Sequence, residues 1–505
     1  MGDPMDQKII AVIDAGSNSV RLLVARALSE SAFEVVDEER FDARLGGGPD
    51  ASILAPEAME RGVNALRMVA QVAHSHGASE IVAVGTEALR RATNAPAFIE
   101  RIRAETGLEL RVLSSREEAL ASFLGVMNSS LTRDGTILDI GGGSVELIRV
   151  RDREFLSSTS APLGALYARN QYLPKDPPSS REQRALRKAV RAAFDAGPAV
   201  EIAGVGGAIR NIARIIRQRG GYPLRRLHGL VIERREIARL TAALVRVPTE
   251  ERRRIPGVSA GRADVLHAVA IVVDEVMEIS GAARLHVSGQ GLREGLVWQQ
   301  IRPASPVIPD VREASVMGLA RANGIDALAA EPVANAAATL FEGTKSLHRL
   351  AAADLDLLLH GARLAGVGLH VDYYNRDRHA EYLVHSGDLH GFSHREIVLL
   401  GMLVRCADGG SPDAGPYRAL ISPDDPRRIA VLAALLGAAR AIRRRVPSPV
   451  LSVQVEPGRR ALAITLLAES PIDAERIALE RQAGRLEAAL GTPVRIHTEV
   501  GAFAG

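Results

Sequence analysis

Hydrophobic and polar positions alternate along the first 300 residues in a pattern that predicts strands separated by helices. Short aliphatic runs, such as residues 8–13, 81–85 and 135–140, are typical of buried strands. Residues 56–77 and 94–106 instead carry apolar side chains at helical spacing, and a further helix is predicted over 263–279. Strands and helices that alternate in this way favour layered α/β domains.

The pattern changes after the proline-rich stretch at residues 303–309, which predicts a domain boundary. Helical periodicity then dominates over residues 330–348, 354–364, 394–405 and 427–444. Beyond residue 447, two alternating runs flank Pro457 and Gly458, which is a hairpin signal. A helix over 471–490 and a strand over 494–498 complete a small α/β unit at the end.

One internal repeat pairs residues 13–26 with residues 138–151, with six of the fourteen positions identical. Each copy is an aliphatic strand, a turn of glycine and small polar residues, and a second strand. The offset of 125 residues is far longer than a solenoid repeat. The repeat therefore predicts a duplicated domain.

The two turns of the repeat are candidate anion-binding loops, because backbone N–H groups in a glycine-rich turn can converge on an anion. Asp14 and Asp139 each stand two residues before the first glycine of their turn, where a carboxylate suits Mg²⁺ or its bound waters. Either turn alone is typical of a structural hairpin. If the two copies face each other, the tips share one cleft. The side-chain donors in the turns are Ser17, Asn18, Ser19 and Ser144.

Three further carboxylates lie close to these turns in the sequence. Glu146 alternates with Ser144 on the outgoing strand, so the two side chains can share a face. Glu117 and Glu118 stand at the start of a helix that Ser115 is expected to open, with Glu118 at the capping-box spacing. Two interpretations stay open for this pair: they cap the helix, or one of them is a base for water.

Composition narrows the class of protein. Apolar residues make up 47% and aromatic residues only 3%, so the core must be aliphatic. The single cysteine, Cys406, excludes a disulfide framework and a cysteine-rich zinc module. Only four of the 63 basic residues are lysines, and arginine suits phosphate ligands as well as a solvated surface. No targeting signal or long apolar run is found, so we expect a cytoplasmic protein without membrane contact.

Four motifs occur in a fixed order: D-A-G-S-N-S at 14–19, R-E-E-A at 116–119, D-I-G-G-G-S-V-E at 139–146 and G-L-R-E-G at 291–295. The set resembles the exopolyphosphatase/guanosine pentaphosphate phosphohydrolase family of the actin-like, sugar-kinase-like superfamily. The resemblance implies two duplicated actin-like (ribonuclease-H-like) α/β domains, followed by an all-α HD-like domain and a small α/β C-terminal domain. The implied boundaries are 6–130, 131–302, 310–446 and 447–505.

The resemblance also implies roles for residues that match the motifs. Glu118 is similar to the catalytic base, and Arg90 to an arginine that grips the substrate phosphate. Asp139 and Glu146 are similar to acidic ligands of Mg²⁺ or water, and Asp14 is a third candidate ligand. Gly206, Gly207 and the stretch 262–264 match positions that line the cleft. The first phosphate loop is expected at Asp14, Gly16, Ser17, Asn18 and Ser19, and the second at Gly141, Gly142, Gly143 and Ser144.

The C-terminal part departs from the family pattern. Seven of the thirteen histidines fall between residues 348 and 394. Where the family often has Leu-His-Glu-Val-Gly, residues 364–368 read Leu-Ala-Gly-Val-Gly, so the adjacent His-Asp metal pair is missing. We therefore expect His379 to be structural or anion-contacting. A basic extension that holds a long substrate is expected at Arg440, Arg443, Arg444 and Arg445.

The resulting expectation is an exopolyphosphatase that removes terminal phosphate from inorganic polyphosphate and releases orthophosphate. Mg²⁺ is the expected cofactor, with a monovalent cation such as K⁺ as a second candidate. The alternatives are a guanosine pentaphosphate 5′-phosphohydrolase, an ATP-dependent kinase of the same superfamily and a non-catalytic nucleotide sensor. The resemblance also implies a homodimer, and no nucleic-acid partner is expected.

Overall fold

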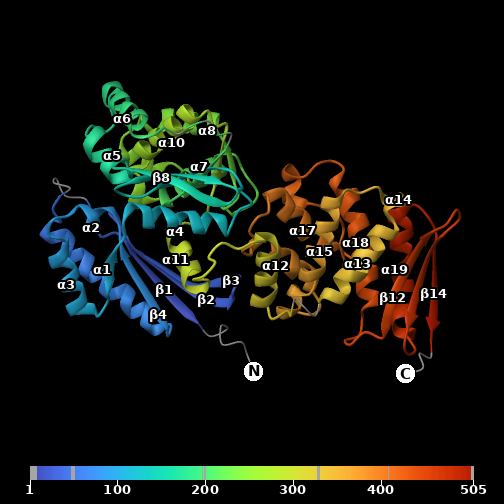
Figure 1. Cartoon of the computed structure of the whole chain (residues 1–505). Coiled ribbons are helices and arrows are strands. Elements are labelled where there is room, and N and C mark those ends of the chain that lie inside the picture. The colour runs from blue at the N-terminus through green and yellow to red at the C-terminus, as the bar shows by residue number, and fades with distance from the viewer. Residues whose placement is uncertain are drawn as a thin grey trace. The chain divides into compact units, whose positions relative to one another are not determined.

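Two β-sheets with related strand order organise the first part of the chain in the computed structural model (Figure 1). In the first sheet the order is β3-β2-β1-β4-β5. β1 pairs antiparallel with β2 and parallel with β4, so the hairpin of the first repeat lies at the centre of the sheet. The strands are β1 (Ile9–Ala15), β2 (Val20–Ser29), β3 (Ala32–Phe41), β4 (Glu80–Gly85) and β5 (Leu110–Val112).

The second sheet repeats this arrangement in the order β10-β11-β9-β6-β7-β8. β6 pairs antiparallel with β7 and parallel with β9, as β1 does with β2 and β4. The domain duplication predicted by the sequence repeat is therefore confirmed. The strands are β6 (Gly135–Ile140), β7 (Val145–Arg151), β8 (Glu154–Ala161), β9 (Glu201–Val205), β10 (Val231–Glu233) and β11 (Arg284–Val287).

Helices cover both sheets, and one of them is buried along most of its length. The amphipathic helix α1 buries Val63, Leu66 and Val69 against the first sheet. α10 is buried from Leu266 to Met277 inside the second half, and Glu278 near its end is exposed. The helices are α1 (Pro56–Ser75), α2 (Glu87–Arg91), α3 (Ala95–Thr106), α4 (Ser115–Met127), α5 (Ala165–Tyr172), α6 (Ser180–Ala193), α7 (Gly207–Arg219), α8 (Arg234–Leu244), α9 (Thr249–Arg254), α10 (Leu266–Ser280) and α11 (Leu292–Ile301).

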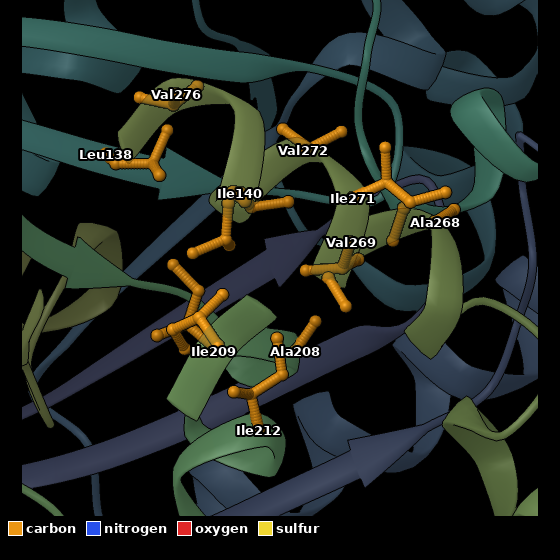
Figure 2. Close-up of a cluster of buried hydrophobic side chains, with 14 of the residues drawn as sticks. Leu138, Ile140, Ala208, Ile209, Ile212, Ala268, Val269, Ile271, Val272 and Val276 are labelled. Carbon is orange, nitrogen blue, oxygen red and sulfur yellow. The ribbon is translucent and has the colours of Figure 1, made fainter. Parts of the chain in front are cut away.

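The core of the second half is aliphatic, as the low aromatic content predicts. Figure 2 shows Leu138 and Ile140 of β6 facing Ile209 of α7 and Val269 and Val272 of α10. Each such side chain contributes about 1.5–3 kcal/mol when it is fully buried. This packing fixes β6 and α7, whose ends carry the second glycine turn and the Gly206–Gly207 turn.

The C-terminal part begins with a helical bundle and ends in a small sheet of order β12-β13-β14. β12 and β13 pair antiparallel and confirm the predicted hairpin, while β14 runs parallel to β13. The elements are α12 (Val311–Ala322), α13 (Glu331–Gly343), α14 (Lys345–His348), α15 (Ala352–Leu364), α16 (Arg376–Ser386), α17 (His394–Ala407), α18 (Asp425–Ile442), β12 (Val450–Pro457), β13 (Leu462–Ala468), α19 (Asp473–Leu490) and β14 (Val494–Val500).

Two predicted helices differ from the structure. The helix predicted over 330–348 is divided at Thr344, whose hydroxyl donates to the carbonyl of Leu340 and whose backbone leaves the helical region. The helix predicted to begin at Ala263 begins at Leu266, because the short 3₁₀ helix at Ala260–Arg262 precedes it. Both differences arise from local backbone conformations that hydrophobic periodicity does not report.

The described residues are 8–46, 52–195, 197, 199, 201–326, 330–407 and 409–501, and the sequence predictions for residues 6 and 7 lie outside them. The chain divides into two compact units, Met1–Val311 and Arg312–Gly505. The finer four-part division and the HD-like character of the helical part stay predictions. Within the described residues, no helix is both long and apolar enough to cross a membrane.

Candidate active site

The two glycine turns of the repeat meet inside the first unit. Each turn is closed in the same way, by a hydrogen bond from Gly16 N to Ser19 O of 3.1 Å in one and from Gly141 N to Ser144 O of 3.0 Å in the other. A Cβ atom added to Gly143 would lie 2.6 Å from the Oγ atom of Ser17, so no side chain fits between the tips. The expectation that the two tips share one cleft is therefore confirmed.

A cavity of about 110 Å³ lies between the turns. Its walls include nearly all of the residues proposed from the sequence, but neither Glu146 nor Arg90 belongs to its lining. The sequence motifs thus converge in space, although they span almost 300 residues of chain. The proposed residues that line the cavity are Asp14, Gly16, Ser17, Asn18, Ser19, Glu118, Asp139, Gly141, Gly142, Gly143, Ser144, Gly206, Gly207 and Arg262.

The start of α4 separates the roles of its two acidic residues. Ser114 caps the helix: its Oγ accepts the N–H of Glu117 at 3.2 Å, and Oε2 of Glu117 accepts the N–H of Ser114 at 2.8 Å. The predicted capping box at Ser115 and Glu118 is therefore wrong by one residue. Because successive helical residues are rotated by about 100°, Glu118 turns away from the cap and lies buried in the wall of the cavity.

Arg90 of α2 binds Glu118 directly. Its Nη1 donates to Oε2 of Glu118 at 3.0 Å and to the carbonyl of Leu113 at 2.8 Å, while Nη2 donates to Oε2 of Glu87 at 2.7 Å. Burial raises the pKa of Glu118 to about 7, although the charge of Arg90 opposes this shift. The guanidinium is thus held by protein groups in this structure, and the grip of Arg90 on phosphate stays a prediction.

Of the other three carboxylates, Glu146 is also buried, and Asp14 and Asp139 are partly buried. Ser122 of α4 donates a hydrogen bond to Asp139, and Ser160 of β8 donates to Oε1 of Glu146 at 2.9 Å. Burial raises the pKa of Glu146, and the neighbouring charges of Glu118 and Asp139 raise it further. Burial likewise raises the pKa values of Asp14 and Asp139. Such a concentration of buried acids needs cations nearby to stay ionised.

Four arginines in the cavity wall supply that positive charge, of which one is buried and three are partly buried. Arg21 of β2 donates from Nε to Oγ of Ser19 at 3.2 Å, and Arg210 of α7 donates to the carbonyl of Gly289 at 2.9 Å. Burial lowers the pKa of Arg262, and repulsion from Arg21 lowers it further. Because arginine keeps its proton, the repulsion among these positively charged side chains is relieved when an anion binds. The four residues are Arg21, Arg210, Arg262 and Arg293.

Sequence reasoning proposed only Arg262 among these four as a residue of the cleft. The sequence carries a signal for Arg21, because the repeat offset of 125 residues aligns it with Glu146. Glu146 is itself one of the predicted site residues. Arg293 stands in the motif at 291–295, but the sequence predicts no role for this arginine. It reaches across the unit and donates to the carbonyl of Leu22 at 3.1 Å and to Oε1 of Glu38 at 2.8 Å. We found no comparable sequence signal for Arg210.

The carboxylates suit a partly hydrated metal ion better than a closed protein cage. Within the described parts of the chain, no group of three or more histidine, cysteine or acidic side chains is placed to hold a metal. Mg²⁺ commonly takes one or two carboxylates and completes its shell with water and substrate phosphate. Asp14 fits that pattern, because its Oδ1 is buried and has no hydrogen-bond partner.

Comparison with known proteins identifies the family of the chain. The model of the Ppx/GppA phosphatase family matches residues 23–303, and the model of Ppx/GppA phosphatase domain III matches residues 311–470. The solved Ppx/GppA family member of Aquifex aeolicus is 28% identical, with a TM-score of 0.52, and the match covers 59% of this chain and 99% of that one.

Two more solved structures are similar over the same extent. An exopolyphosphatase of Cytophaga hutchinsonii is 23% identical with a TM-score of 0.55, covering 60% of this chain and 100% of that one. An exopolyphosphatase-like protein is 26% identical with a TM-score of 0.52, covering 58% and 99%. Since the first family model extends over more than half of the sequence, the chain belongs to the Ppx/GppA phosphatase family and is a phosphoanhydride hydrolase.

Proposed function

We propose that the protein is an exopolyphosphatase, which hydrolyses the terminal phosphoanhydride of inorganic polyphosphate and releases orthophosphate. The observation that carries the proposal is the cavity itself. Two glycine turns and four arginines line it, together with Glu118, a buried carboxylate whose pKa is about 7. Anion-binding groups therefore stand beside a group that can accept a proton near neutral pH.

Phosphoryl transfer depends mainly on position and on stabilising the charge of the equatorial oxygens. In the proposed complex, N–H groups of the turns at 16–19 and 141–144 hold the terminal phosphate. Arg21, Arg210 and Arg293 neutralise its oxygens and those of the next phosphate in the chain. Bound Mg²⁺ would add charge neutralisation on the phosphate oxygens, with Asp14 and Asp139 as its candidate protein ligands.

Glu118 is the proposed base that orients and deprotonates the attacking water. Its buried position raises its proton affinity into the range useful for a base at neutral pH. We assign Arg90 the role of holding Glu118 in position and of limiting the rise in the pKa of Glu118. Arg90 donates a hydrogen bond to the carboxylate of Glu118 and does not line the cavity. Asp139 and Glu146, fixed by Ser122 and Ser160, are proposed to order water or metal beside it.

Guanosine pentaphosphate is the alternative substrate, because its terminal phosphate would meet the same groups. One feature favours polyphosphate. Among the described residues that line the cavity there is no aromatic side chain on which a guanine ring could stack. A repeating chain of phosphates, by contrast, offers an anion to each of the four arginines.

The test compares the two adjacent acids of α4. Glu118→Gln should lower kcat by about 10² or more and leave KM within a few fold, because only proton transfer is lost. Glu117→Gln is the matched control, since it removes the same charge from an exposed helix cap outside the cavity. The measurement is orthophosphate release from polyphosphate at saturating substrate. Equal loss in both variants, or near-normal turnover in Glu118→Gln, would contradict the assignment.

A further inference from the structure

Arginines gather beside the cavity of the first unit as well as in its wall. Arg262 lines the cavity, while Arg40 of β3 and Arg214 of α7 lie next to it without belonging to its lining. We propose that Arg40 and Arg214 form an outer phosphate subsite, which binds phosphates further along the substrate than those held in the cavity. The inference rests on the proposed function, because it takes the cavity as the place of the terminal phosphate. It adds two residues that determine which substrates bind tightly.

The short 3₁₀ helix at Ala260–Arg262 brings the three arginines together. Directly before it, Oγ of Ser259 accepts a hydrogen bond from Nη1 of Arg214 at 3.0 Å. A Cβ atom added to Gly261 would lie 3.7 Å from Nη2 of Arg40, which reaches this helix from the first half of the duplication. Arg262 follows in the chain and lines the cavity. One short segment therefore connects the cavity to the two arginines outside it.

The pairing of β2 with β3 places two like charges side by side. Arg21 and Arg40 are direct partners in this antiparallel ladder, so their side chains share one face of the sheet. Elsewhere in the same ladder, Arg26 stands opposite Glu34 and forms an ion pair with it. Like charges that stand directly opposite each other destabilise a sheet. Such a cost is expected where function requires the charge, and a bound anion would offset it.

The arginines of the proposed subsite keep bonding capacity for a ligand. Nη2 of Arg40 donates to Oδ1 of Asp42 at 2.6 Å, but Nε of Arg40 is buried without a hydrogen-bond partner. Arg214 meets a neutral hydroxyl at Ser259, which does not balance its charge. Burial and the repulsion from four other arginines, Arg40 and Arg214 among them, lower the pKa of Arg262 to about 9. A phosphate beside Arg40 and Arg214 would reduce this repulsion.

A second phosphate group of the same substrate is the ligand that fits these positions. The planar fork of a guanidinium matches two phosphate oxygens, and the charge of both partners strengthens the hydrogen bonds. Two substrates carry such a group. Inorganic polyphosphate offers the later phosphates of its chain, and guanosine pentaphosphate offers its 3′-diphosphate. In both, a phosphate outside the cavity is joined covalently to the phosphate inside it.

The test measures affinity by calorimetry in EDTA on the Glu118→Gln chain, so that the ligand is not consumed. Longer-chain polyphosphate should bind at least about tenfold more tightly than pyrophosphate. Arg40→Gln with Arg214→Gln should remove most of this difference. The affinity for pyrophosphate should stay within about threefold, because pyrophosphate remains in the cavity and salt screens the more distant charges. The matched control is Arg26→Gln with Arg219→Gln, which removes the same charge from exposed positions of the same strand pair and the same helix.

A residue-level readout tests the subsite without substituting its arginines. Longer-chain polyphosphate should protect Arg40 and Arg214 of the Glu118→Gln chain from phenylglyoxal, detected by mass spectrometry. Pyrophosphate should not protect them, and Arg219 should stay reactive with either ligand. A parallel comparison of GTP with guanosine pentaphosphate, which differ only in the 3′-diphosphate, shows whether the nucleotide also uses the subsite.

The outcomes separate this inference from the proposed function. An advantage of longer chains that survives Arg40→Gln with Arg214→Gln, an equal loss in the control pair, or no protection of the two arginines would overturn the outer subsite. Binding that depends on Arg40 and Arg214, in a wild-type protein that releases no orthophosphate with Mg²⁺ present, would refute only the proposed function.

Discussion

Adjacent residues in α4 acquire opposite properties from their places on the helix. Hydrogen bonds from Ser114 lower the pKa of Glu117, while burial raises that of Glu118 to about 7. The sequence left two interpretations open: the two acids cap the helix, or one of them is a base for water. It placed the cap one residue too late, because Ser114 and Ser115 are both plausible caps and only the backbone conformation distinguishes them.

The pKa of Glu118 predicts the pH dependence of catalysis. A base must be deprotonated, so kcat/KM should rise with pH through about 7 and level off above it. Arg90 lowers this pKa, so Arg90→Gln should move the acid limb of the profile to higher pH and reduce the rate at pH 7.

The neighbouring arginine provides the control for that experiment. Arg91 pairs with Glu87 at 3.5 Å and does not contact Glu118. Arg91→Gln should therefore leave the midpoint of the acid limb unchanged. If Arg90→Gln raises KM for phosphate chains and leaves the midpoint of the acid limb unchanged, Arg90 is a phosphate ligand in the working enzyme.

At the scale of elements, Glu118 and Arg293 are positioned by one very close helix pair, α4 and α11. The backbones approach at glycines: a Cβ added to Gly295 would lie 1.8 Å from the carbonyl oxygen of Ala121, and one added to Gly125 would lie 2.2 Å from that of Gly291. Figure 1 shows α11 beside α4 within the first unit. The glycines of the motif at 291–295 therefore serve helix packing as well as the turn before α11.

This contact predicts the effect of one added methyl group. Gly295→Ala should destabilise the first unit by about 1–3 kcal/mol and reduce activity, because the backbones must separate. Gly484→Ala in α19 is the matched control: nothing lies within 4 Å of its Cβ, and alanine favours the helix by up to about 1 kcal/mol. Thermal unfolding and phosphate release measure both effects. A stable, fully active Gly295→Ala protein would show that this packing does not position the site.

The elements around the site differ in how well the sequence predicts them. The two hairpins were predicted to within a few residues, because their aliphatic strands and glycine turns are local signals. The contact of Arg293 with the carbonyl of Leu22 joins positions 271 residues apart, which no local pattern reports. Because such long-range contacts leave no local pattern, the sequence did not predict all four arginines of the cavity wall. The internal repeat could have indicated Arg21.

At the scale of the molecule, all of the residues that line the cavity between the glycine turns belong to the first unit. Each half of the duplication contributes one glycine turn and at least one buried carboxylate. The chain up to Ile308 belongs to this unit, since Asn128 donates to the carbonyl of Pro306 at 2.6 Å and accepts the N–H of Ile308 at 2.8 Å. The solved relatives, matched over 99–100% of their own length, cover only 58–60% of this chain.

These observations predict that residues 1–311 fold alone and keep the chemical step. For tripolyphosphate, kcat of this fragment should stay within about tenfold of the full chain, as expected for a unit with its own core. Circular dichroism establishes that the fragment is folded before phosphate release is measured. A folded but inactive fragment would mean that the second unit supplies part of the catalytic site.

The central claim is that the cleft between the two glycine turns removes terminal phosphates from polyphosphate. The most direct measurement resolves the products of long-chain polyphosphate over time, with and without Mg²⁺, beside guanosine pentaphosphate. We predict Mg²⁺-dependent release of orthophosphate alone, with a higher kcat/KM for polyphosphate and loss of both reactions in Glu118→Gln. Internal cleavage fragments, release that Glu118→Gln leaves intact, or a clear preference for guanosine pentaphosphate would contradict the account.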